Sequence, residues 1–408
     1  MTAINVSAGE GAEWALDITV FKRRRALCSL FFVIGLSMAT WVTRTPDIRD
    51  SLSASTSEMG MVLFGLSLGS IIGVLVAAVL VREFGTKPVV SFGVSALVFS
   101  LSVMALGASL STALIVAAGL FIFGLGMATA EIALNIEGAN VEQVICKPVV
   151  TQLHGFYSFG MFLGAIFGIV LNAAEFSILV HLMSIVAIGA VVVALSLGHL
   201  QVGLGRLQQA EEGCASIKRL GFVAHLRDYR LLLVCVLVLA IALAEGTAND
   251  WLPLLMVDGH GYSGAASSIV YAGFTAVMTI GRFAGSYFID RFGRDRILRI
   301  CVGLAVAGLA GVVFFSHPLL AGLSALLWGL GVSIGFPVCI SAAGDSPDDP
   351  ETRVSIASTA AYFAFLVGPP MLGFLGQSFG LRLAMIPVLF MLVVVFFLVP
   401  VVRQRSWG

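Results

Sequence analysis

The chain has 408 residues, of which 59% are hydrophobic and only 11% are charged, and its mean hydropathy is +1.02. Soluble domains contain about 25% charged residues, so this composition excludes a chain that is mostly water-exposed. The formal net charge of +0 removes any broad argument for nucleic-acid binding, and the sequence predicts no nucleic-acid partner.

The first apolar run is predicted to stay in the membrane. Residues 1–21 contain three acidic side chains, and four basic residues at 22–25 precede an apolar run to about Val42. A signal peptide would end at a small-residue cleavage site, and none follows here. The run therefore reads as the first transmembrane helix.

Twelve apolar runs are long enough to span a bilayer, which takes roughly 20 residues. They fall at about 26–43, 59–81, 88–107, 111–136, 148–171, 176–198, 231–256, 265–289, 297–316, 318–342, 354–377 and 381–402. We predict an all-α polytopic membrane protein of twelve transmembrane helices. Its parts are an N-terminal tail (1–21), a six-helix bundle (22–199), a linker (200–230), a second six-helix bundle (231–403) and a C-terminal tail (404–408). Just before the second run, Ser55-x-x-Glu58 is typical of a capping box that opens the helix.

The basic residues predict the orientation. If the N-terminus is cytoplasmic, nearly all Lys and Arg fall in cytoplasmic loops, and only Arg44, Arg49 and Arg382 fall outside. Arg282, late in the 265–289 run, then lies near the cytoplasmic side. We expect a multi-pass protein of the cell inner membrane with both termini in the cytoplasm.

The two halves repeat each other. Gly73 and the Phe84-Gly85 pair have counterparts at one constant offset in Gly281 and the Phe292-Gly293 pair. Duplicated halves joined by a polar linker are typical of transporters with a central site, so we expect two pseudo-symmetric bundles.

The sequence Gly285-x4-Asp290-Arg291-Phe292-Gly293-Arg294 resembles the cytoplasmic signature of the major facilitator superfamily. The counterpart in the first half has Arg82-Glu83 where Asp-Arg is usual, followed by Gly85. The resemblance covers about residues 22–405 and implies the major facilitator fold with alternating access. It assigns a gating role to Arg82, Glu83, Gly85, Gly285, Asp290, Arg291, Gly293 and Arg294.

A finer resemblance concerns three motifs. These are Trp41-x-x-Arg44-x-Pro46-x-Ile48, Glu131-x3-Asn135 and His154-Gly155-x-x-Ser158-x-Gly160. They are similar to a bacterial subgroup that includes a rhizopine transporter, which implies a methylated amino-inositol as solute.

Ionisable side chains inside spans are informative because each costs roughly 2.5–3.5 kcal/mol at the bilayer centre. Glu245 lies near the middle of the 231–256 run, and Asn249 follows one turn later on the same face. Asp250 and Trp251 lie nearer the outer end. We interpret all four as solute-binding and Glu245 or Asp250 as a proton carrier; the alternative is a structural acid bonded to a neighbouring helix.

A second polar group is expected toward the cytoplasmic side. Glu131 and Asn135 are one turn apart in the 111–136 run, and His154 and Tyr157 lie early in the 148–171 run. An acid near a histidine suits proton relay, since histidine titrates near neutrality. Asn135 and Tyr157 are candidate solute contacts, and a structural polar lock between two helices is the alternative. The acidic and basic residues that follow, Glu137, Glu142 and Lys147, are expected to be loop charges.

Three further residues complete the candidate site. Trp41 and Arg44 are predicted to close over the solute; an interfacial position is the alternative for Trp41, and Arg44 has Asp47 or Asp250 as a possible counter-ion. Trp328 offers a surface on which a ring stacks, with buried aromatic packing as the alternative.

The predicted function is secondary transport of a small polar solute, namely a sugar, an inositol or an amino-inositol such as a rhizopine. Helix 148–171 lacks the Gly-Pro pair of antiporters, which favours proton symport or facilitation. An exporter of drugs or metabolites and a non-transporting receptor are the alternatives. No Walker A, H-E-x-x-H or dinucleotide motif occurs, and the cysteines lack metal spacing. We therefore expect no enzymatic activity, cofactor or metal. The expected partners are the lipid bilayer, the solute and protons, and the protein is expected to be a monomer.

Overall fold

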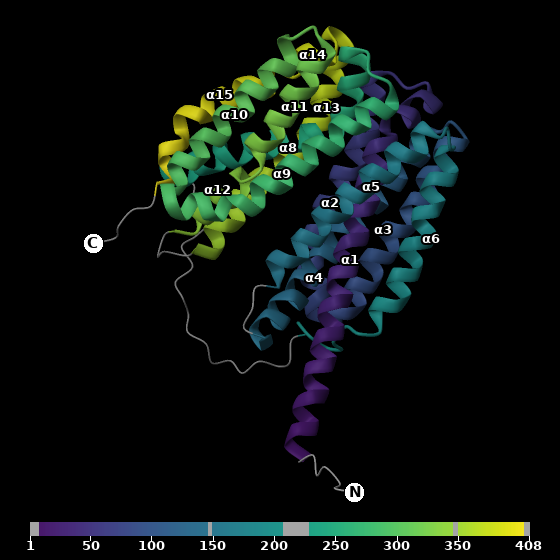
Figure 1. Ribbon diagram of the computed structural model, residues 1–408, viewed down its shortest axis with the longest axis vertical. Helices are drawn as coiled ribbons and strands as arrows, with labels where there is room; N and C mark the ends of the chain where they lie inside the picture. Colours follow the sequence, from purple (N-terminus) through teal and green to yellow (C-terminus); the bar gives the residue numbers. More distant parts are fainter. Residues whose placement is uncertain (1–7, 146–148, 207–227, 346–349, 404–408) are drawn as a thin grey trace, which may run out of the picture.

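The computed structural model describes residues 8–145, 149–206, 228–345 and 350–403, and the described chain is helical almost throughout (Figure 1). The first half contains α1 (Ala8–Leu52), α2 (Thr56–Phe84), α3 (Thr86–Ser109), α4 (Ala113–Ile145), α5 (Val150–Ala173) and α6 (Ile178–Leu197). The second half contains α8 (Tyr229–His260), α9 (Gly264–Phe292), α10 (Arg294–Phe314), α11 (Pro318–Val332), α12 (Gly335–Ala343), α13 (Pro350–Phe379), α14 (Leu381–Ala384), α15 (Ile386–Leu398) and the 3-10 helix η1 (Val399–Val402).

Twelve segments of the described chain are long and apolar enough to cross a membrane, as the hydropathy pattern predicts. Two of them are interrupted. The predicted run 318–342 is divided between α11 and α12 at Ser333 and Ile334, and the run 381–402 is divided among α14, α15 and η1. The first span is also longer than predicted, because α1 begins at Ala8, inside the segment assigned to a tail.

Local sequence explains several helix ends. The Ser55 side chain accepts from the backbone N–H of Glu58, and the Glu58 carboxylate accepts from the N–H of Ser55, so the predicted capping box is confirmed. Gly85 and Gly293 separate α2 from α3 and α9 from α10, with φ of 87° and 84°. Only glycine adopts such angles without strain, and the same turn at equivalent positions supports the predicted repeat.

The helices form two bundles that pack against each other along α2 with α13 and α5 with α9. Within the first bundle α4 packs on α2 and α3, and α1 packs on α5; within the second, α8 packs on α13 and α10 on α11. The N-terminal bundle (purple to teal) and the C-terminal bundle (green to yellow) lie side by side in Figure 1. Large apolar side chains such as Phe390 and Phe397 remain exposed on the outside, as lipid-facing helices require.

Contacts that join the bundles gather at one end of the molecule. There Arg49 at the end of α1 forms an ion pair with Asp258 at the end of α8, and the backbone N–H of Thr56 donates to Gln377 at 3.0 Å. Helices α2 and α13 touch at Gly60, where an added methyl group would come within 2.9 Å of the Cα of Gly373. The bundles are therefore closed at this end, which we call the closed end. At the opposite end α3 and α10 begin and η1 ends, next to Arg82, Arg291 and Arg294. We call this the arginine-rich end.

Candidate functional site

An ion pair lies midway along the helices of the second bundle. Glu245 lies halfway along α8, and its Oε1 accepts a hydrogen bond from Nη2 of Arg282 in α9 at 2.6 Å. The two side chains retain 16% and 33% of their exposure. The sequence analysis placed Arg282 late in its span near the cytoplasmic side, but did not predict that its side chain is the counter-ion of a mid-helix acid. A paired charge is the form in which an acid is tolerated at this depth.

Arg282 also contacts the interruption between α11 and α12. Its Nε donates to the carbonyl oxygen of Ser333 at 3.2 Å. That residue ends α11, so its carbonyl is not bound as in a continuous helix. Arg282 thus links three helices of the second bundle through one guanidinium group.

The first bundle brings Tyr157 to this ion pair. The charges of Glu131, Arg282 and Glu245 all act on the Tyr157 hydroxyl, which therefore lies close to groups of both bundles. Glu131 comes from α4 and acts also on Tyr362 of α13. The structure thus gathers Glu131, Tyr157 and Glu245 into one ionisable cluster across the interface between the bundles.

His154 lies one turn before Tyr157 in α5, and the charge of Arg282 acts on its ring. Its ring packs edge-on against Phe31 of α1, with centroids 5.2 Å apart. The predicted Glu131–His154 relay has no direct hydrogen bond among the described residues, and His154 instead joins the cluster from the Arg282 side.

Two acids of the interface have no partner. Within the described part of the chain, neither Glu131 nor Asp250 accepts a hydrogen bond or an ion pair, although Asp250 is only 8% exposed. A buried carboxylate in this position needs a proton or a cation as partner. Asn135 is in a similar position, because its buried Oδ1 has no partner among described atoms.

Asn249 is held by a residue that sequence reasoning missed. The hydroxyl of Tyr271 in α9 donates to Oδ1 of Asn249 at 3.2 Å, and Tyr271 is fully buried. Tyr157, Asp250 and Glu245 all act electrostatically on the same hydroxyl. Tyr271 therefore lies near both Glu245 and Asp250. No spacing rule marks it, since the partner is on another helix.

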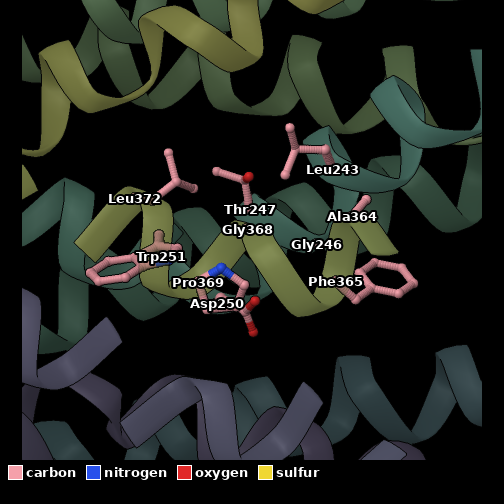
Figure 2. A pocket seen from close by; sticks show the side chains of 10 residues that line it. All are labelled: Leu243, Gly246, Thr247, Asp250, Trp251, Ala364, Phe365, Gly368, Pro369 and Leu372. Carbon is pink, nitrogen blue, oxygen red and sulfur yellow. The ribbon is translucent and has the colours of Figure 1, made fainter. Parts of the chain in front are cut away.

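A narrow crevice, too tight in this structure to admit a water molecule, runs beside Asp250 between α8 and α13. Figure 2 shows the Asp250 carboxylate pointing away from Thr247, toward ribbons of the first bundle. The indole N–H of Trp251 and the hydroxyl of Thr247 line the crevice and have no partner among described atoms. Pro369 carries no backbone N–H, so the carbonyl of Phe365 on the same wall loses its helical donor. The crevice thus offers hydrogen-bonding groups of both kinds.

The remaining predicted solute contacts, Trp41, Arg44 and Trp328, are buried and make contacts outside this cluster. Trp41 and Trp328 are fully buried, and Trp328 packs edge-on against Phe274 with centroids 5.6 Å apart. Their burial favours packing for Trp328 and disfavours an interfacial position for Trp41. Arg44 donates to Asp47 at 2.7 Å, so Asp47 rather than Asp250 is its counter-ion.

The comparisons with known proteins agree with this architecture. The model of the Major Facilitator Superfamily matches residues 25–353, which is most of the chain. This chain belongs to the major facilitator superfamily.

Relatives of this superfamily member cover nearly its whole length. It is 28% identical over 383 residues to the uncharacterized transporter y4wD of Sinorhizobium fredii, covering 93% of this chain and 98% of the relative. It is 25% identical over 366 residues to the membrane protein MosC of Rhizobium meliloti, covering 88% and 85%. A crystal structure of a variant of the nucleoside transporter NupG matches with a TM-score of 0.77 at 14% identity, covering 93% of this chain and 99% of that one. The protein is thus a multi-pass membrane transporter of the superfamily and not an enzyme.

The residues predicted to form a gating motif are divided between exposed and buried positions. Arg82, Glu83, Asp290 and Arg291 are exposed at the arginine-rich end. Arg294 turns inward instead, where Nη1 donates to Oδ1 of Asp345 at 3.0 Å and Nε donates to the carbonyl of Val402. Gly285 packs against Ile334 at the interruption of the tenth span. The described contacts of Arg294 lie within one bundle.

Glu137 is the clearest correction to the sequence analysis. It was expected to be a loop charge, but it is fully buried in α4. Its carboxylate accepts from Nε of Arg23 at 2.7 Å and from the hydroxyl of Thr86 at 2.5 Å. Arg23 lies 114 residues away, within a run of four basic residues, so neither partner was marked by sequence. Thr86 is the first residue of α3, and Arg294 is the first residue of α10. In each bundle the start of this helix therefore bonds an acid, Glu137 in the first bundle and Asp345 in the second.

The neighbouring charges also differ from expectation. Glu142 lies within α4 and accepts from the backbone N–H groups of Val149 and Val150 at 2.8 and 3.1 Å, so it caps the start of α5 rather than standing in a loop. Lys147 lies outside the described residues.

Proposed function

We propose that this transporter carries a small hydroxylated solute that bears a protonated amine, such as an amino-sugar or amino-inositol, in symport with protons. The observation that carries the proposal is the Glu245–Arg282 pair, whose charges act on the Tyr157 hydroxyl of the other bundle. A site shared by both bundles is where a carrier that works by alternating access holds its solute.

The charges of the cluster favour a cationic ligand. Among the described residues the cluster holds three carboxylates, those of Glu131, Glu245 and Asp250, and only Glu245 is paired with a guanidinium group. Because two of these acids lack a partner among the described residues, the cluster favours protons, a solute amine or both. The crevice groups of Thr247 and Trp251, together with Asn249, suit hydroxyls.

Arg282 supplies a route for coupling. When a proton or an amine occupies Glu245, the ion pair weakens and Arg282 keeps only the Ser333 carbonyl. Binding would then alter how α9 holds the interrupted tenth span. A ligand shifts a conformational equilibrium only through such differential contacts.

The distribution of basic residues supports a proposed orientation. The positive-inside rule supports a cytoplasmic arginine-rich end, cytoplasmic termini and residence in the inner membrane. With the opposite end closed by Arg49 and Asp258, the structure then represents an inward-facing state. We propose import by a monomer whose bundles span 22–199 and 231–403, joined by the linker 200–230.

The test is uptake of labelled solutes into proteoliposomes, with and without an inward proton gradient. The panel pairs an amino-inositol with inositol and an amino-sugar with its parent sugar. We expect the amine of each pair to enter at least tenfold faster, and faster still with the gradient. Equal uptake of both partners would reject the amine. Binding without uptake would identify a receptor, and preference for apolar drugs would identify an exporter.

A further inference from the structure

A second hollow lies far from the solute site, at the arginine-rich end. It has a volume of about 470 Å³ and lies between the start of α8 and the end of the twelfth span. Its walls include Tyr229, Arg230, Leu233, Phe397, Val401 and Arg403. Tyr229 is sixteen residues before Glu245, or about 24 Å along α8 at 1.5 Å per residue. The hollow therefore belongs to a different site.

Its rim is cationic and its wall apolar. Arg230 and Arg403 are the only charged residues that line it among those described. Asp228, a described acid two residues before Arg230, does not line the hollow, and its Oδ2 accepts from Arg353 at 2.6 Å. Leu233 and Phe397 lie deeper along their helices, and Phe397 is 72% exposed on the lipid-facing surface.

The rim is also preformed. Arg230 donates through Nε to the carbonyl of Val401 at 3.1 Å and through Nη2 to the carbonyl of Arg403 at 2.9 Å. These bonds fasten the chain after α15 to the start of α8. They hold the backbone of Arg403 beside Arg230 while leaving the Arg403 side chain exposed.

We propose that this hollow binds an anionic phospholipid. The phosphate and the anionic headgroup lie between Arg230 and Arg403, because guanidinium groups match phosphate oxygens in charge and geometry. One acyl chain lies against Leu233 and Phe397. Both helices reach the headgroup level here, where Tyr229 is the kind of aromatic residue that occupies the membrane interface. Basic pockets between spanning helices are sites of this type.

The test measures lipid binding by the purified full-length protein with native mass spectrometry and thermal unfolding. Phosphatidylglycerol and phosphatidylcholine of identical acyl chains are titrated against the wild type. We expect tighter binding and a higher melting temperature with phosphatidylglycerol. Arg403→Gln should weaken that binding about fivefold, which is the contribution of one basic residue near an anionic headgroup. Leu233→Trp, which fills the hollow, should weaken it as well.

Arg299→Gln is the matched control, because Arg299 is an exposed arginine of α10 at the same end and does not line the hollow. It should bind phosphatidylglycerol like the wild type. Inorganic phosphate at millimolar concentration should leave the melting temperature unchanged; if it reproduced the shift, the ligand would be a free anion. Equal binding of both lipids, or a phosphatidylglycerol preference that survives both Arg403→Gln and Leu233→Trp, would overturn the proposal. If Leu233→Trp has a lower melting temperature than the wild type in the absence of lipid, that variant is destabilised. The lipid preference of Arg403→Gln, which changes an exposed side chain, then decides whether the proposal holds.

Discussion

Glu245 and Arg282 are 37 residues apart in the chain and form an ion pair at 2.6 Å between α8 and α9. The charges of the pair act on the Tyr157 hydroxyl of the other bundle, and Arg282 also donates to the Ser333 carbonyl where the tenth span is interrupted. One contact thus connects the proposed solute site with the only span of the described chain that is divided near its middle. The predictions below test this arrangement and the contacts that support it.

Removing one partner of the central pair should destabilise the protein more than removing both. Arg282→Gln leaves Glu245 without its counter-ion. Breaking a fully buried pair costs ~3–5 kcal/mol, and we expect less here because one third of the Arg282 side chain is exposed. The double variant Glu245→Gln with Arg282→Gln should recover much of the lost melting temperature. Additive losses in this double-mutant cycle would show that the two charges do not interact.

Glu137 should be more important for stability than for transport. Glu137→Gln leaves Arg23 buried without its carboxylate, and we expect a loss of about 3 kcal/mol with a clear drop in melting temperature. Glu83→Gln, an exposed acid at the same end, is the control and should change little. The KM for solute should stay unchanged in both, since neither residue belongs to the central cluster. A Glu137→Gln variant as stable as the wild type would contradict the role of the buried pair.

The closed end should open when its ion pair is broken. Asp258→Asn removes the partner of Arg49 across the bundles, so we expect a larger population open at that end. Spin labels are placed at the start of α2 and the end of α13, which both lie at the closed end, in a background without native cysteines. Electron–electron distance measurements between the labels report this population. Asp50→Asn is the matched control, because Asp50 also bonds Arg49 but lies in the same bundle. Identical distance distributions in the two variants would show that the Arg49–Asp258 ion pair does not hold this end closed.

Asp228 should contribute stability that depends on pH. Partial burial raises the pKa of its carboxyl, but the hydrogen bond from Arg353 and those from the backbone of Leu231 and Arg230 lower it further, and the net shift is downward. A carboxyl whose folded pKa is depressed stabilises the fold above its unfolded pKa of about 4, and that stability is lost as pH falls through the folded pKa. Asp228→Asn keeps the helix cap and removes the charge. The melting temperatures of wild type and variant should therefore differ at pH 6 and converge below about pH 4. A constant difference across this range would contradict the assignment.

The fold was largely predictable because hydropathy and basic residues act over whole segments. Twelve spans, the repeat marked by Gly85 and Gly293, and the Ser55 cap all follow from local patterns. Partners were not predictable in the same way. Sequence position indicates how deep a side chain lies in a span, but not which helix it faces, so the pairings of Arg282 with Glu245 and of Glu137 with Arg23 were missed.

In the candidate site, too, the polar residues could be predicted from the sequence but their partners could not. Glu131, Tyr157 and Glu245 were found by their scarcity as polar groups in apolar runs, and the structure brings them together. Tyr271 was missed because its only signal is a hydroxyl that meets Asn249 of another helix. Trp328 was proposed as a stacking surface, yet its ring is enclosed by Phe274, since exposure depends on neighbours distant in sequence.

The most direct test of the central claim is solute uptake by Glu245→Gln in proteoliposomes at neutral and acid pH. Glu58→Gln, which changes an exposed acid at the closed end, is the control for insertion and handling. Because the substitution removes the carboxylate proposed to bind the solute amine, the account predicts at least a tenfold loss of uptake at both pH values with normal membrane insertion. Full uptake by Glu245→Gln at both pH values would contradict it.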